Sequence, residues 1–277
     1  MEFFKYEATA NDFLMLDGIS SHVSLEPSDV PALCDRRRGV GADGVILMLP
    51  SRSADMRMVI YNADGTEAEM CGNGIRALFR FGLDRGTVSA DTVRVETPAG
   101  ERSVSISASE TGADLFTVGM GQPGLLRSEV PMLGEPSEQA VGVPIELPGD
   151  RAVEATCVSM GNPHCVLFVD DVGEYPVATV GPLIEHHALF PERTNVEFVA
   201  VESPGALRAR VWERGVGETM ACGTGACASL VAANLLGTAA KRAAVSLPGG
   251  DLLVDWRDEG VFLTGPATYV FEGRIGR

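Results

Sequence analysis

Lysine is nearly absent from this chain: Lys5 and Lys241 are the only two among its 277 residues. Enzymes that use pyridoxal phosphate hold it as a Schiff base on a lysine, so the sequence offers that cofactor almost no anchor. The six cysteines include no C-x-x-C pair and no spacing typical of a structural zinc site. We therefore expect no cofactor and no metal, and we expect reduced thiols rather than a disulfide framework.

Long apolar segments are absent as well. No run of about 18 apolar residues occurs, and the first residues lack the apolar core of a signal peptide, so we expect a cytoplasmic protein without membrane contact. The formal net charge of −16 repels phosphate backbones, which argues against a nucleic-acid partner. Hydrophobic residues make up 45% of the chain, enough to bury the core of one large domain or two ordinary ones.

A short phrase, Cys-Gly-x-Gly, occurs twice, at Cys71 and at Cys222. Each copy is followed by a run of residues that reads as a helix. A cysteine at a helix N-terminus lies at the positive end of the helix dipole, which favours the thiolate. Two cysteines in matched settings predict two acid–base or nucleophilic groups that share one task. The other four are interpreted as small buried apolar residues: Cys34, Cys157, Cys165 and Cys227.

Further matches show that the whole chain is duplicated. The pairs, each separated by the same 151 residues as the two cysteines, are Glu67 and Glu218, Asn62 and Glu213, Tyr61 and Trp212, Arg57 and Arg208, and Asn11 and Asn162. The equal offsets predict two halves built on one plan, with an internal period far longer than that of a solenoid. We expect an N-terminal half over residues 1–121 and a C-terminal half over 122–262, joined near the Gly-rich segment 119–124.

The elements expected in each half are mostly strands. Segments rich in β-branched and aromatic residues predict strands at 13–16, 44–48, 57–61, 93–96, 103–107, 165–169, 195–199, 208–212, 245–247 and 252–256. Helices are predicted at 30–37, 74–83 and 225–236. The last of these carries no charge and is apolar or small on every side, which is typical of a helix that is buried all round. The predicted fold class is therefore α+β: two pseudo-symmetric domains, each a curved, barrel-like mixed sheet wrapped around a central helix, with the active site in the cleft between domains.

This arrangement indicates one kind of chemistry. The amides in the first turn of a buried helix bind a carboxylate, and glycines let a ligand approach them closely. Two such helices facing one bound carboxylate would place a thiolate and a thiol on opposite sides of its α-carbon. One would remove the α-proton and the other would return a proton to the opposite face, which inverts the configuration. The two thiols would then titrate as a coupled pair. A thiol redox couple and a non-catalytic binding module remain as alternatives.

Polar residues near the second cysteine add to this hypothesis. His164 lies in the turn Gly161-Asn162-Pro163-His164 before a predicted strand, where it is either a structural histidine or a group that tunes a cysteine. Glu213 and Arg214 are adjacent and would suit the amine and carboxylate of a zwitterion. The four asparagines expected in loops or at strand ends, either as turn residues or as ligands, are Asn11, Asn62, Asn162 and Asn195.

Taken together, the motifs resemble the diaminopimelate epimerase family over nearly the whole chain. The stretches that carry the resemblance are 11–13, 39–44, 61–65, 71–76, 159–165, 190–195, 212–215, 221–225 and 263–267. The family pattern usually has His-Gly-x-Gly where this chain has Glu7-Ala8-Thr9-Ala10, and often a tyrosine where it has Phe271.

The resemblance implies a cofactor-independent epimerase that interconverts LL- and meso-diaminopimelate for lysine and peptidoglycan synthesis. It implies that Cys71 and Cys222 are the two bases and that His164 and Glu213 adjust their pKa values. It also implies that residues 263–277 return to the first domain and that the protein is a homodimer. The substrate-binding residues carried over are Asn11, Asn62, Gly72, Asn73, Asn162, Asn195, Glu213, Arg214, Gly223 and Thr224. A cofactor-independent racemase of another amino acid, such as proline or histidine, is the remaining alternative on the same scaffold.

Overall fold

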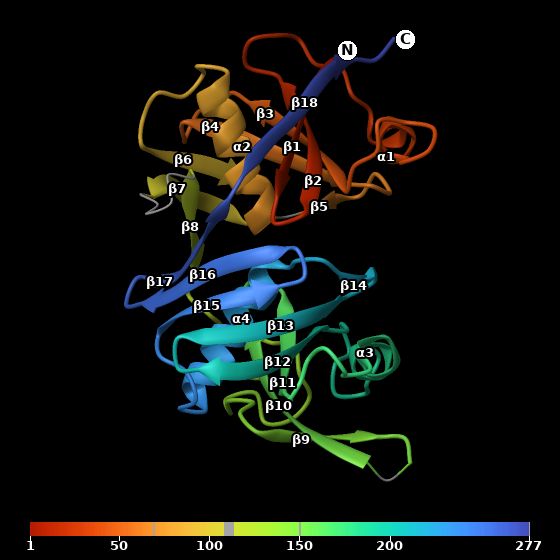
Figure 1. The fold of residues 1–277 in the computed structure, drawn as a ribbon, viewed down its shortest axis with the longest axis vertical. Helices are drawn as coiled ribbons and strands as arrows, with labels where there is room; N and C mark the ends of the chain where they lie inside the picture. Colours follow the sequence, from red (N-terminus) through yellow and green to blue (C-terminus); the bar gives the residue numbers. More distant parts are fainter. Residues whose placement is uncertain (69, 108–113, 150, 277) are drawn as a thin grey trace. The chain divides into compact units, whose positions relative to one another are not determined.

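The computed structural model describes residues 1–68, 70–107, 114–149 and 151–276 (Figure 1). Its tertiary contacts divide the chain into two compact units, Met1–Gly119 with Thr264–Arg277, and Met120–Leu263. The chain leaves the first unit within β8 (Leu115–Gly121) and returns to it within β17 (Gly260–Pro266). The C-terminal strand is therefore part of the first unit.

Each unit is a mixed sheet with few helices. Besides β8 and the end of β17, the first unit contains β1 (Glu2–Ala8), β2 (Asn11–Asp17), η1 (Pro27–Asp29), α1 (Val30–Cys34), β3 (Gly44–Leu49), β4 (Met56–Asn62), β5 (Glu67–Ala68), α2 (Gly72–Asp84), β6 (Thr92–Thr97), β7 (Gly100–Ser107) and β18 (Thr268–Arg274). The second unit contains β9 (Val143–Leu147), β10 (Arg151–Ser159), β11 (Pro163–Phe168), α3 (Val177–Glu185), β12 (Asn195–Ser203), β13 (Ala206–Glu213), β14 (Gly217–Thr219), α4 (Gly223–Leu235), β15 (Arg242–Leu247) and β16 (Gly250–Arg257).

The two sheets repeat one pairing pattern. In the first unit β2 runs parallel to β3 and β4 parallel to β6, and the other registered pairs are antiparallel. In the second unit β11 runs parallel to β12 and β13 parallel to β15. The register repeats as well. Phe13 pairs with Gly44 in the first unit, and the residues 151 positions later, His164 and Asn195, pair with each other in the second. The duplication predicted from the sequence is thus present in the strand pairing.

Each sheet surrounds one central helix. This confirms the predicted fold class of α+β units with a curved mixed sheet around a helix. α2 contacts β1, β2, β3, β4 and β7, and α4 contacts β10, β11, β12, β13, β15 and β16 (Figure 1). Ten of the thirteen residues of α4 are buried, as its uncharged sequence predicts. Gly237 follows this helix with φ 73°, a left-handed conformation that glycine adopts without strain and that ends the helix.

A second, smaller layer lies outside each sheet. In the first unit, Val30 and Cys34 of α1 pack into a buried cluster with Leu14, Leu16 and Val45. In the second unit, α3 places Val177, Val180 and Ile184 in a cluster with Val196 and Phe198 of β12. All four cysteines interpreted as small buried residues are buried: Cys34, Cys157, Cys165 and Cys227.

Some expected elements differ from those observed. The helix predicted over 30–37 ends at Cys34, because the Asp35 carboxylate accepts the backbone N–H groups of Arg37 and Arg38 at 2.7 and 2.9 Å and folds a turn there. No helix was predicted at α3, which begins after Pro176 and carries Pro182 inside it. Two prolines in a short segment weaken a helical pattern. The strands that were not predicted are β1, β5, β8, β9, β10, β14, β17 and β18. In the part of the chain that the structure describes, no helix is both long and apolar enough to cross a membrane.

The turn between β1 and β2 is strained. Thr9 and Ala10 have φ angles of 55° and 60°, in the left-handed region that side chains with a Cβ disfavour. We expect Ala10→Gly to raise the free energy of unfolding by about 0.5 to 1 kcal/mol, because relief of strain in the folded state exceeds the added entropy of the unfolded chain. Urea denaturation checks this. Unchanged or lower stability would show that the turn carries no strain at Ala10.

Candidate functional site

Both repeated cysteines are N-caps. Cys71 and Cys222 have extended backbones, and each sulfur accepts the backbone N–H three residues on, from Gly74 at 3.3 Å and from Gly225 at 3.4 Å. The thiols thus replace the oxygen that usually caps a helix. Amides in the first helical turn have no carbonyl within the helix to bond, so they point outward as an anion-binding group. The residues predicted to supply them are Gly72, Asn73, Gly223 and Thr224.

In the first unit, Asn11 organises the surroundings of Cys71. Its Oδ1 accepts from the Cys71 thiol at 3.8 Å and from the Asn73 amide at 3.4 Å, while its own Nδ2 donates to Asp43 at 2.9 Å. The structure therefore brings together three of the predicted residues of this half. Asn62 is exposed and donates to Thr66 at 3.0 Å, within the turn that follows β4.

Arg76 was not predicted as a site residue, although it is fully buried on α2. Its guanidinium donates to the Asn73 side chain at 2.9 Å, to Thr9 Oγ1 at 2.9 Å and to the Gly72 carbonyl at 3.2 Å. It thereby ties the first turn of α2 to the β1–β2 turn. The signal in the sequence was a charged residue at a position where the second half has the apolar Cys227.

A partly exposed ionic cluster fixes the segment that carries Asn11. Arg36 donates two hydrogen bonds to Asp12, at 2.7 and 3.0 Å, and Lys5 lies 2.7 Å from the same carboxylate. Arg36 also bonds Asp43, the residue that accepts from Asn11. Burial alone would raise the pKa of Asp12, but the hydrogen bonds from Arg36 and Lys5 outweigh it and lower the pKa to about 2.

This lowered pKa predicts acid sensitivity. The unfolded carboxyl titrates near 3.8, so the stability that Asp12 contributes is complete above that pH and is lost as the pH falls toward 2. The shift corresponds to about 2 kcal/mol. Urea unfolding of the wild type and Asp12→Asn should therefore differ by about this amount at pH 6 and converge only as the pH falls to about 2 and below. A constant difference across that range would contradict the assignment.

In the second unit, Cys222 is only 6% exposed. Burial raises the pKa of its thiol well above the ordinary value, and the carboxylates of Glu213 and Glu197 raise it further. Hydrogen bonds from Thr224 and from the Gly225 amide act in the opposite direction. The helix N-terminus thus favours the thiolate as predicted, but burial outweighs it, and the thiol is the stable form in this state.

Glu213 is the carboxylate next to this thiol. It accepts from Thr219 at 2.6 Å. Burial raises its pKa, although the hydrogen bonds from Thr219 and Cys222 and the field of His164 partly counteract that effect. A carboxyl group with a raised pKa beside a thiol is suited to exchanging a proton with it.

His164 lies inside the second unit, fully buried on β11. Its Nδ1 is 2.7 Å from Glu197 Oε1 and its Nε2 is 3.0 Å from Asn162 Oδ1. Asn162 Nδ2 donates to Thr224 at 3.4 Å, and the Thr224 hydroxyl lies 3.4 Å from the Cys222 sulfur. The structure thus joins four predicted residues in one chain of hydrogen bonds, and adds Glu197, which the sequence analysis missed.

Asn195 and Arg214 also contact each other. The Asn195 side chain donates to the Pro163 carbonyl at 2.8 Å and accepts the Arg214 backbone N–H at 2.9 Å. The guanidinium of Arg214 is exposed and donates to the Glu192 carbonyl at 3.1 Å. Asn195 therefore holds the turn that presents Arg214, and a direct contact of Asn195 with substrate stays a prediction.

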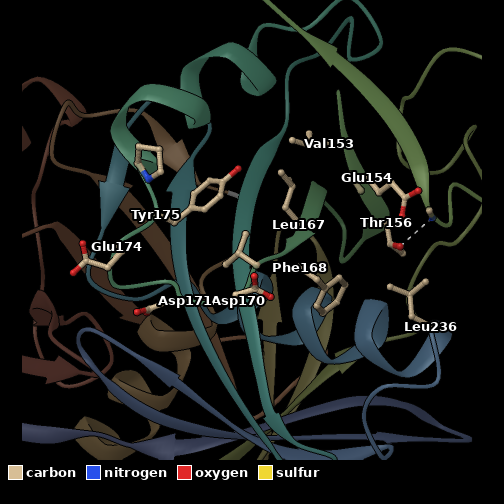
Figure 2. A pocket seen from close by; sticks show the side chains of 14 residues that line it. Val153, Glu154, Thr156, Leu167, Phe168, Asp170, Asp171, Glu174, Tyr175 and Leu236 are labelled. Atoms are coloured by element: carbon tan, nitrogen blue, oxygen red, sulfur yellow. Dashed lines mark hydrogen bonds between the residues drawn. The ribbon is translucent and has the colours of Figure 1, made fainter. Parts of the chain in front are cut away.

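A cavity of the second unit lies away from these residues. It has a volume of about 540 Å³, and Figure 2 shows Glu154, Asp170, Asp171 and Glu174 around it. Leu236, at the C-terminal end of α4, also lines it, whereas Cys222 lies at the other end of that helix. Thirteen helical residues span about 20 Å. No predicted site residue is among those lining this cavity, and its carboxylates would repel a carboxylate ligand.

Within the described ranges, no three His, Cys, Asp or Glu side chains are grouped so that they could bind a metal ion. The polar groups around the two cysteines are instead amides, hydroxyls and single carboxylates. They are suited to binding and proton transfer.

Solved structures of the same fold define the class. The chain matches a phenazine biosynthesis protein of the PhzF family from Bacillus anthracis with a TM-score of 0.72 and 17% identity, covering 100% of this chain and 99% of that one. It matches a probable proline racemase from Agrobacterium radiobacter K84 with a TM-score of 0.71 and 16% identity, covering 99% and 92%. These similarities establish that the chain has the two-unit α+β fold of the PhzF and proline racemase structures.

Sequence comparison then identifies the family. The diaminopimelate epimerase family model matches residues 3–126 and 156–270. Relatives named diaminopimelate epimerase include one from Pelotomaculum thermopropionicum, 50% identical over 99% of this chain and 98% of the relative, and one from Moorella thermoacetica, 48% identical over the same shares. The chain belongs to the diaminopimelate epimerase family, and it is accordingly an isomerase of the epimerase type.

Proposed function

We propose that this protein inverts one α-carbon of LL-2,6-diaminopimelate to give the meso form, without a cofactor, by proton transfer between Cys71 and Cys222. The observation that carries the proposal is that both cysteines cap buried helices at matched positions of a duplicated fold. Curated relatives at 48% to 50% identity that bear this enzyme's name support the choice of substrate.

In the proposed mechanism the substrate α-carboxylate is bound by the first-turn amides of the two helices. One cysteine, as thiolate, removes the α-proton, and the negative charge that develops is spread onto the bound carboxylate. The other cysteine, as thiol, donates its proton to the opposite face. The C–H bond that breaks and the one that forms lie on opposite sides, so the configuration inverts and the two thiols exchange protonation states.

The raised pKa of Cys222 supports its assignment as the proton donor in the LL-to-meso direction. Glu213 is proposed to adjust the protonation of Cys222, with which it shares a hydrogen bond. His164 is proposed as the second modulating group. The residues proposed to bind the substrate are Asn11, Asn62, Asn162, Asn195, Glu213 and Arg214, together with the helix-start residues Gly72, Asn73, Gly223 and Thr224.

The biological setting follows from the same proposal. The product would serve lysine and peptidoglycan synthesis in the cytoplasm, and the partner would be a second copy of the chain in a homodimer. Tyr269, Val270 and Phe271 support dimerisation because these three large side chains are exposed on β18, 41% to 47% of their surface. The acidic charge gives no support to a nucleic-acid partner.

Incubation of the protein with LL-diaminopimelate in heavy water tests the substrate. We expect deuterium to enter the α-position while the meso isomer forms, and we expect no exchange with L-proline or L-histidine under the same conditions. Exchange with either of these amino acids but not with diaminopimelate would instead assign the chain to a sister racemase. Absence of exchange with all three would contradict the proposal.

A further inference from the structure

We propose that Glu197 is a positioning residue that controls the protonation of Cys222 through a relay of His164, Asn162 and Thr224. The inference rests on the proposed function only in taking Cys222 as an acid–base group. The relay itself is read from contacts within the second unit, between residues of β11, β12 and the start of α4.

The hydrogen-bond partners of His164 decide which atoms carry protons. A carboxylate only accepts, so Nδ1, at 2.7 Å from Glu197, carries a proton. The Asn162 amide is oriented with Oδ1 toward Nε2, at 3.0 Å, and because this oxygen only accepts, we infer that Nε2 carries a proton too. His164 is therefore an imidazolium paired with the Glu197 carboxylate, and both side chains are fully buried.

The direction of the next two bonds follows. With its oxygen toward His164, Asn162 presents its NH₂ group to Thr224 Oγ1 at 3.4 Å. The Thr224 oxygen accepts that bond, so its own proton is available for the Cys222 sulfur 3.4 Å away. A hydroxyl that donates to sulfur stabilises the thiolate. The relay therefore stabilises the form that Cys222 takes after it has given its proton to the substrate.

Loss of the Nε2 proton would reverse the direction of the hydrogen bonds from His164 through Asn162 to Thr224. Neutral His164 would need a donor at Nε2, so the Asn162 amide would rotate and turn its oxygen toward Thr224. The hydroxyl proton would then go to Asn162, and the thiolate would lose one donor. The charge that keeps His164 doubly protonated is that of Glu197, which thus acts on Cys222 at a distance.

Two features mark Glu197 as more than a packing residue. A Cβ placed on Gly225 would lie 2.8 Å from Glu197 Oε1, so the carboxylate is lodged under the first turn of α4, where the helix dipole favours a negative charge. Its Oε2 is buried and has no hydrogen-bond partner among the residues the structure describes. A half-satisfied buried carboxylate is costly unless its charge serves a purpose.

The duplication supplies an internal comparison. The residue equivalent to Glu197 in the first unit is Ile46, and a Cβ placed on Gly74, the equivalent of Gly225, would lie 2.8 Å from Ile46 Cδ1. The residue equivalent to His164 is Phe13. One half of the repeat thus has an apolar pair where the other has an ion pair. The fold therefore does not require charge at these positions.

The titratable groups that surround the relay come from every neighbouring strand. They are Glu213 on β13, Cys222 at the start of α4, and Cys165 and Cys157 on β11 and β10, with Cys165 in the field of Glu197. Glu213 bonds Cys222 directly, so it sets the proton balance of the thiol alongside the relay. Variants of Glu197 must therefore be compared with Glu213 intact.

The decisive variant is Glu197→Gln, because two accounts predict opposite results. If Glu197 acted only as a nearby negative charge, its neutralisation would make the Cys222 thiolate easier to form. The relay predicts the reverse, since His164 would lose its Nε2 proton. We expect the pH midpoint of Cys222 alkylation by iodoacetamide to rise by about one unit, a roughly tenfold lower rate near neutral pH. Peptide mass mapping separates Cys222 from the other cysteines.

Thr224 provides the matched control. Thr224→Val removes the hydroxyl without changing shape, and Thr224→Ser keeps it. We expect Glu197→Gln to raise the midpoint in the Thr224→Ser background and to leave it unchanged or lower it in the Thr224→Val background. An equal rise in both backgrounds, or a fall in the otherwise wild-type protein, would overturn the relay.

A direct measurement is made on the wild-type protein. In ¹⁵N-histidine-labelled protein the ring nitrogens of only four histidines are visible, and His164→Asn assigns the relevant pair. We expect both nitrogens of His164 to be protonated at neutral pH. A neutral His164 would contradict the relay. Neither readout uses the epimerase reaction, so failure of the relay and failure of the proposed function are distinguishable.

Discussion

Cys71→Ala and Cys222→Ala should each lower kcat for epimerisation by about 10³-fold or more. Each variant removes the group proposed to transfer a proton on one face, and general acid–base groups contribute about 10² to 10⁴ in rate. A steady-state assay that starts from LL-diaminopimelate and measures the meso isomer checks this. KM should change much less than kcat, because the helix amides that we propose to bind the carboxylate remain in place.

Matched controls come from cysteines outside both helix caps. Cys34 and Cys157 are buried, and Cys34→Ala and Cys157→Ala remove the same thiol from the apolar packing of each unit. We expect both to cost about 1 kcal/mol of stability and to leave kcat within a few-fold of the wild type. Substantial activity in either Cys71→Ala or Cys222→Ala would contradict the two-thiol mechanism.

Gly225→Ala should strongly destabilise the second unit. The added Cβ would lie 2.8 Å from Glu197 Oε1 and 3.2 Å from Cys222 Cβ. The carboxylate cannot retreat without breaking its 2.7 Å bond to His164, so the first turn of α4 must shift. We expect the free energy of unfolding to fall by about 2 to 3 kcal/mol in urea, with loss of most activity.

Gly74→Ala is the equivalent change in the first unit. Its Cβ would meet the terminal methyl of Ile46, which can rotate away. The strain is therefore smaller, and the higher helix propensity of alanine offsets part of it, so we expect a loss of about 1 kcal/mol or less. If the two substitutions proved equally mild, the carboxylate under α4 would not be rigidly held.

The features that could be predicted from the sequence are mainly those that occur in both halves of the duplicated chain. The cysteine caps, the central helices and the strands β2, β3, β11 and β12 are all marked twice along the sequence, so each half supports the interpretation of the other. Elements that break the pattern were harder to predict. The early end of α1 depends on hydrogen bonds that the Asp35 carboxylate accepts from two backbone N–H groups, and α3 contains a proline.

The missed site residues are those that differ between the halves. Glu197 stands where the first half has Ile46, and Arg76 stands where the second half has Cys227. A charged residue in one half, at a position where the other half has an apolar residue, was a visible signal. Hydrophobic periodicity alone does not detect it, because a single charge does not change the pattern of an apolar element. The direction of the shift in the Cys222 pKa could be found only from the structure, because it depends on how far burial outweighs two hydrogen bonds.

The central claim is that two different thiols act on opposite faces of one α-carbon. It is tested most directly by following deuterium in both isomers during the first few per cent of conversion in heavy water. The thiol that donates has exchanged with solvent before binding, whereas the abstracted proton goes to the other thiol. We expect the meso product to carry one deuterium at the inverted carbon while the remaining LL substrate carries almost none. Deuterium entering unreacted LL substrate as fast as product, or protium retained in the product, would show that one base serves both faces.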